Sequence, residues 1–201
     1  MLRKFQLAAV LLGICSLVVA APVPTKYSAD ANHSNVGFSV PILDGVSQVK
    51  GKFTSFTINL DYDEANITNS SVNAVIKTAS IDTGIDGRDK HLRSADFFDA
   101  EKYPEITFQS KRVEKKGKNF LAIGDFTMHG VTKEVTIPFT VTGKFVNPAN
   151  QQMSAGFSAN LTINRRDYGM TWKHSSIPSF VGDLVNIELA ILVRTQAAKA
   201  S

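Results

Sequence analysis

The sequence predicts an all-β protein built from eight or nine antiparallel strands. Apolar and polar residues alternate along most of the chain, which is typical of strands with one buried and one exposed face. Short turns join most of these segments, and short connections favour antiparallel neighbours. Only one segment, at 81–109, loses the alternation and indicates a helix.

The first half of the chain contains short to medium strands. They are expected at residues 27–31, 36–40, 46–62 and 71–81. In the third of these, the apolar face lies on odd positions up to Phe53 and on even positions from Phe56. A β-bulge at Thr54 and Ser55 would reconcile the two halves, because an extra residue reverses the direction of every later side chain.

The second half has the more regular alternation. Strands are expected at residues 105–114, 120–128, 135–145, 153–163 and 185–193. The pattern of the third of these places Phe145 on the same inward face as Val135. A single long loop is expected at 165–183.

Eight such strands can remove their exposed edges by closing into a barrel. A barrel of this size either fills its interior with side chains or holds one elongated ligand. Two sheets packed face to face are the alternative arrangement.

The segment at 81–109 is expected to form a lid over one end of the sheet. A short helix is predicted at 88–94, with Asp86 accepting hydrogen bonds from its first amides. A helix of about two turns needs tertiary contacts, and Leu92, Phe97 and Phe98 can supply them.

The two ends of the chain are expected to lie outside the barrel, which is assigned to 26–195. Residues 1–20 resemble a cleaved signal peptide, with Arg3 and Lys4 before a short apolar run and small residues at its end. A short extended leader at 21–25 and a disordered tail at 196–201 complete the predicted organisation. The protein is therefore expected to be exported to the periplasm or secreted.

Composition and motifs give no indication of a nucleic-acid, metal or catalytic site. The formal charge of +4 falls to +2 without Arg3 and Lys4, and basic residues are interleaved with acidic ones, so nucleic acid is not an expected partner. The acidic run from Asp82 has Arg93 where a calcium loop requires glutamate. The four histidines are far apart, and no G-x-S-x-G motif occurs. No metal, cofactor or catalytic residue is therefore predicted, although His91 lies near two aspartates.

Four stretches of the sequence carry a family resemblance. They are IDTGIDGRDKHLRSADFFDAEKYPEITFQS, GDFTMHGVTKEVTIPFTV, FSANLTINRRDYGM and VGDLVNIELAI. Together they resemble the YceI family of exported, lipocalin-like, polyisoprenoid-binding proteins, over about residues 26–194. The stretch TWKHSSIPSF has no counterpart in that pattern.

The resemblance implies an eight-stranded antiparallel, lipocalin-like barrel that carries or stores a long isoprenoid lipid, without a catalysed reaction. The alternative is a stress-related structural or interaction protein whose barrel is filled by its own side chains. A membrane surface in transient contact and a second copy of the chain are also open as partners.

The expected lumen residues are apolar side chains from the strands and the lid. They are Phe38, Phe56, Ile58, Phe97, Phe98, Phe108, Phe126, Ile137, Phe139, Phe157, Leu161, Ile163, Ile187 and Leu189. A polar or pyrophosphate head group is expected to meet arginines at the mouth, namely Arg88, Arg93, Arg165 and Arg166.

Overall fold

A computed structural model describes residues 24–196 as strands joined by turns, with one α-helix. The predicted signal peptide and most of the predicted leader and tail lie outside this range. The helix is α1 (Asp86–Arg93). The strands are β1 (Thr25–Ala29), β2 (Asn35–Ile42), β3 (Ser47–Phe53), β4 (Phe56–Tyr62), β5 (Ser71–Lys77), β6 (Ile81–Asp82), β7 (Glu105–Lys116), β8 (Asn119–Met128), β9 (Val131–Val146), β10 (Met153–Asn164) and β11 (Leu184–Thr195).

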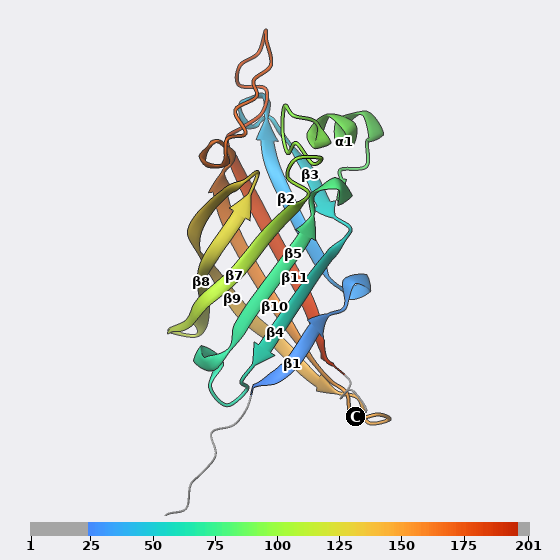
Figure 1. The fold of residues 1–201 in the computed structure, drawn as a ribbon, viewed down its shortest axis with the longest axis vertical. Coiled ribbons are helices and arrows are strands. Elements are labelled where there is room, and N and C mark those ends of the chain that lie inside the picture. Colours follow the sequence, from blue (N-terminus) through green and yellow to red (C-terminus); the bar gives the residue numbers. More distant parts are fainter. Residues whose placement is uncertain (1–23, 197–201) are drawn as a thin grey trace, which may run out of the picture.

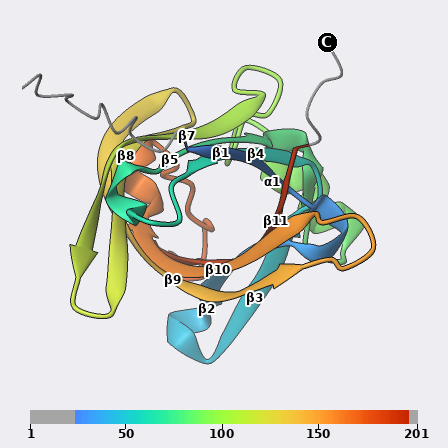
Figure 2. The ribbon, with the colours of Figure 1, turned by 90° about the horizontal axis from the view of Figure 1, so that it is seen from below.

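These segments form one closed, eight-stranded antiparallel barrel, as predicted. Three of the eight barrel strands are interrupted, and each is made of two segments. The first consists of β1 and β2, which both pair with β11. The second consists of β4, which pairs with β1, and β3, which pairs with β2; the third consists of β5, which pairs with β4, and β6, which pairs with β3. Pairing of β1 with β11 closes the ring. Figure 1 shows the barrel from the side, and Figure 2 shows the ring of strands along its axis. A two-sheet sandwich is therefore excluded.

The predicted bulge at Thr54 and Ser55 is a break between β3 and β4. The change of face is confirmed, because Phe53 and Ile58 are both buried. The backbone amides of Thr54 and Ser55 donate to the carbonyl and hydroxyl oxygens of Ser80, at 3.0 and 3.1 Å. These bonds replace the strand pairing that a bulge would have kept.

A bulge does occur in β9, where the sequence pattern did not predict one. Val141 pairs with Phe157 and Gly143 with Gly156, so Thr142 is an extra residue opposite β10. Its insertion reverses the alternation, and Lys144 now pairs with the buried Ala155. The predicted inward position of Phe145 is therefore wrong, and this side chain is 62% exposed.

Helix α1 begins two residues earlier than predicted, and Asp86 does not cap it. The N-cap position is Ile85, which makes no side-chain hydrogen bond to the helix. Asp89 is the buried carboxylate, and it accepts hydrogen bonds from the backbone amide and hydroxyl of Thr83. These bonds attach the start of the helix to the chain that leaves β6. No helix within residues 24–196 is long and apolar enough to cross a membrane.

Candidate binding cavity

The interior of the barrel contains a cavity of about 250 Å³. Thirteen of the fourteen predicted lumen residues line it, and they come from both the strands and the lid. The exception is Phe56, at the start of β4, which packs against the core from a half-buried position. The barrel is therefore not filled by its own side chains.

Small residues on the inner face help to leave this space open. Ala74, Ala122 and Ala159 lie on β5, β8 and β10, at positions where the alternation points inward, and all three line the cavity. They are not among the predicted lumen residues, all of which are large apolar side chains. Their place in the alternation was the signal that could have identified them.

The cavity extends along the barrel between two differently built ends. At one end it is lined by Leu92, Phe97 and Phe98 of the lid and by Val181 of the long loop. At the other end it reaches Ile67 in the turn between β4 and β5. Figure 1 shows α1 and the β4–β5 turn at opposite ends of the molecule, which agrees with an elongated space.

Of the four arginines predicted to meet a head group, Arg165 lines the cavity, but its guanidinium is hydrogen-bonded to the protein's own backbone. It donates from Nη1 to the carbonyl of Met170 at 2.6 Å and from Nε to the carbonyl of Gly182 at 3.0 Å. Its Nη2 donates to the carbonyl of Val181 at 3.3 Å and lies 3.0 Å from Asp183 Oδ1. Burial lowers the pKa of Arg165, while Asp183 opposes this effect. Arg165 therefore clamps the two ends of the loop at 165–183.

The other three predicted arginines do not line the cavity. Arg88 donates from Nε to the hydroxyl oxygen of Thr83 at 2.7 Å and from Nη2 to the carbonyl oxygen of Thr83 at 2.8 Å. Arg93 donates to the carbonyls of Ala79 and Ile81, both at 2.8 Å. Arg166 lies 2.7 Å from Asp183 Oδ2. Their contacts hold the lid and the loop in place, and their predicted role toward a head group stays a prediction.

Aromatic contacts join the lid to the loop. The ring of Trp172, in the stretch that lacked a family counterpart, lies 5.1 Å from Phe97 and 5.2 Å from His91 between ring centroids. His91 also pairs with Asp96 at 2.9 Å and does not line the cavity. No group of residues suited to a metal ion occurs within 24–196.

Two tyrosines pack together at the opposite end of the barrel. Tyr62 lines the cavity and packs edge to face against Tyr27 and Phe157, each at 5.7 Å between centroids. Lys144, which the bulge in β9 places opposite Ala155, forms an ion pair with Glu64 and lies 5.7 Å from the Tyr62 ring centroid. The hydrogen bond to Glu64 raises the pKa of Lys144.

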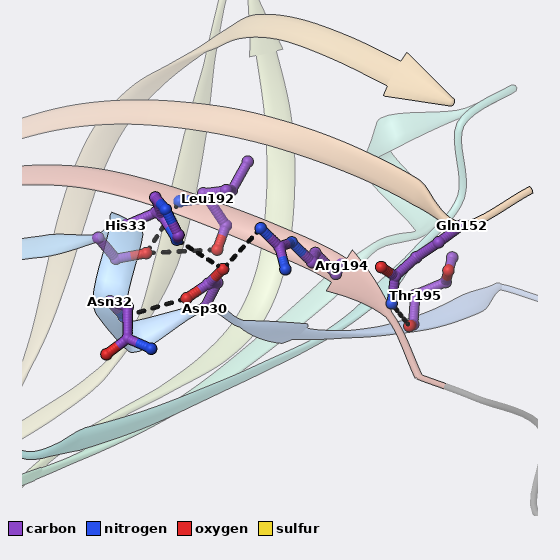
Figure 3. A network of polar contacts seen from close by, with 8 residues as sticks. Asp30, Asn32, His33, Gln152, Leu192, Arg194 and Thr195 are labelled. Atoms are coloured by element: carbon purple, nitrogen blue, oxygen red, sulfur yellow. Dashed lines mark hydrogen bonds and ion pairs between the residues drawn. The ribbon is translucent and has the colours of Figure 1, made fainter. Parts of the chain in front are cut away.

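A polar network also lies on the wall of the barrel, where β1 ends. Asp30 follows β1, and its carboxylate lies 2.8 Å from both His33 and Arg194. It also accepts a hydrogen bond from the amide of Asn32 at 3.0 Å. Figure 3 shows how these residues connect the interruption between β1 and β2 to β11. The network stabilises the closure of the ring and contains no cavity-lining residue.

The chain is similar to known proteins over most of its length. The family model for a YceI-like domain matches residues 27–193. A UPF0312 protein of Vibrio campbellii is 40% identical over 160 residues, covering 78% of this chain and 81% of the relative. A UPF0312 protein of Photorhabdus laumondii is 37% identical over 170 residues, covering 84% and 87%.

Solved structures agree on the fold. BcnA of Burkholderia cenocepacia has a TM-score of 0.73 at 25% identity, over 82% of this chain and 98% of its own. The YceI protein of Campylobacter jejuni has a TM-score of 0.66 at 30% identity, over 75% and 87%. A polyisoprenoid-binding domain from Saccharophagus degradans has a TM-score of 0.61 at 18% identity, over 85% and 98%.

Proposed function

The chain belongs to the YceI-like family, and we propose that its barrel binds a long isoprenoid lipid, such as a polyprenyl or quinone-like chain, and sequesters or carries it. The observation that supports this function is the apolar cavity along the barrel axis. The polyisoprenoid-binding description of the S. degradans domain supports the ligand class by analogy.

The chemistry of the lining favours the tail of such a lipid over its head. Each buried methylene contributes about 0.8 kcal/mol, so a long chain can be bound through apolar contact alone. Within residues 24–196, Arg165 is the one charged residue of the lining, and each of its three guanidinium nitrogens already donates to a backbone carbonyl. A charged head group inside would lose its hydration without gaining a partner. We therefore place the head group, if it is charged, outside the cavity.

The same observations favour binding over the alternative functions. A barrel filled by its own side chains would have no cavity of about 250 Å³. His91 is the only residue for which the sequence suggested acid–base chemistry, and it lies outside the cavity lining. We accordingly propose a carrier or storage protein that catalyses no reaction and uses no cofactor.

Export is a second part of the proposal. Its support is the basic start, short apolar run and small residues at 1–20, a pattern that a signal peptidase cleaves after Ala20. Sequencing the amino terminus of the protein recovered from the periplasm should give Ala21 as the first residue. An intact Met1 in that fraction, or recovery from the cytoplasm alone, would contradict export.

The lipid itself can be identified from the purified protein. Native mass spectrometry before and after organic extraction should show a bound mass that is lost on extraction. The extract should contain a compound with five-carbon isoprene repeats. Repeated recovery of ligand-free protein from cells that make such lipids, together with no uptake of an added polyprenol, would contradict the function.

A further inference from the structure

Two loops meet at the lid end of the barrel and form a tip. The backbone amide of Leu43 donates to the carbonyl of Phe180 at 3.1 Å, and the amide of Gly182 donates to the carbonyl of Pro41 at 2.8 Å. The hydroxyl of Ser179 donates to the carboxylate of Asp44 at 3.0 Å. Figure 1 shows the β2–β3 turn and the long loop together beyond the ends of the strands. The tip is therefore a joined structure and not two separate loop ends.

Apolar side chains are exposed on this tip. Val46 is 84% exposed, Ile177 is 41% exposed and Leu43 is 38% exposed. Leu43 and Asp44 also have positive φ angles of 52° and 56°. This backbone conformation is uncommon for a leucine, whereas aspartate adopts it more readily.

The tip is continuous with the cavity. Val40, in the strand that leads to the β2–β3 turn, and Val181, near the end of the long loop, both line the cavity. An isolated bridge pairs Ile42 with Val181, between the tip and the cavity wall. Exposed apolar residues at the mouth are thus connected to an apolar interior. A lipid tail that moved from one to the other would stay in contact with apolar side chains.

We propose that this tip docks on the surface of a lipid bilayer through Leu43, Val46 and Ile177. The inference rests on the proposed lipid-binding function and names the surface through which the barrel meets its lipid source. Residues 41–47 and 171–180 contain one aspartate and one lysine, so their formal charges cancel. Docking therefore depends on apolar contact and needs no anionic lipid.

The size of the tip favours a bilayer over a second copy of the chain. Stable protein interfaces bury about 1,200–2,000 Å² and use roughly 20–30 residues on each side. Three exposed side chains cannot supply such an area. They suit a weak, reversible contact with the boundary between lipid head groups and acyl chains.

Trp172 is the only tryptophan of the chain and lies in the loop that forms half of the tip. Its fluorescence can therefore report docking without an added label. Vesicles of phosphatidylcholine with brominated acyl chains should quench Trp172 in the full-length mature protein. The quenching should change little between low and high salt, because the contact is apolar.

Val46→Asp should weaken vesicle binding at least about tenfold, because it replaces the most exposed apolar side chain of the tip with a charge. Val146→Asp is the matched control. It makes the same change at the half-exposed valine that ends β9, next to the β9–β10 turn, which lies at the opposite end of the barrel in Figure 1. Its vesicle binding should stay within twofold of the unchanged protein.

Equal binding by the two variants, or no quenching of the unchanged protein, would overturn the docking proposal. So would a dimer in sedimentation analysis that only Val46→Asp dissociates, since the tip would then be an interface between copies. Uptake of a detergent-dispersed polyprenol separates the two proposals, because Val46 does not line the cavity. Intact uptake with failed docking rejects this inference alone, whereas docking without uptake rejects the lipid-binding function.

Discussion

At the scale of single residues, Arg165 shows how a buried charge can position a loop. Its side chain is almost fully buried and bonds three backbone carbonyls and Asp183. Replacing it with methionine leaves these acceptors without their donor, which should cost about 3 kcal/mol or more of unfolding free energy. Arg166→Met should cost less than about 1 kcal/mol, because Arg166 is partly exposed and bonds Asp183 alone among acidic groups. Urea unfolding measures both changes, and equal losses would contradict the clamp.

Asp183 makes this clamp sensitive to acid. The hydrogen bond from Arg166 is the largest cause that lowers its pKa, and the charge of Arg165 adds to it. A carboxylate with a lowered folded-state pKa stabilises the fold above its unfolded pKa of about 3.9, and this stability is lost as pH falls through the folded value. Asp183→Asn should therefore lose stability at pH 6 and show a smaller further loss at pH 3 than the unchanged protein. Identical urea midpoints for the two proteins at both pH values would rule this out.

At the scale of elements, the lid is held by aromatic contacts with the long loop. Trp172→Ala removes the contacts with Phe97 and His91, so the lid should open more often. Amide hydrogen exchange in α1 should become faster by about tenfold, and a bound polyprenol should leave faster. Phe145→Ala, at an exposed aromatic residue of the β9–β10 end, should change neither rate. A lid unaffected by Trp172→Ala would show that other contacts keep it closed.

The elements also show where sequence alternation succeeds and where it stops. It located the strands and the change of face after Phe53, because a period of two follows directly from strand geometry. It could not locate the extra residue Thr142, since one inserted residue depends on the register of the neighbouring strand. The residue preferences of helix caps favoured Asp86, whereas Asp89, inside the helix, is the aspartate that accepts hydrogen bonds from Thr83.

At the scale of the whole molecule, closure and cavity have different origins in the sequence. Eight alternating strands with short turns predict a ring, and the pairing of β1 with β11 confirms it. The same alternation cannot distinguish a filled barrel from a hollow one, because it gives the direction of each side chain and not the sum of their volumes. Small inward residues such as Ala159 line the hollow interior together with the large ones.

Lipid occupancy of a narrowed barrel tests the central claim most directly. Ala159→Phe adds a large ring at a cavity-lining position, whereas Ala190→Phe adds the same ring at an exposed position of β11. Native mass spectrometry after incubation with a polyprenol should show one bound lipid for the unchanged protein and for Ala190→Phe. Ala159→Phe should remain folded by circular dichroism and bind at least tenfold less. Full occupancy of a folded Ala159→Phe protein would contradict binding inside the barrel.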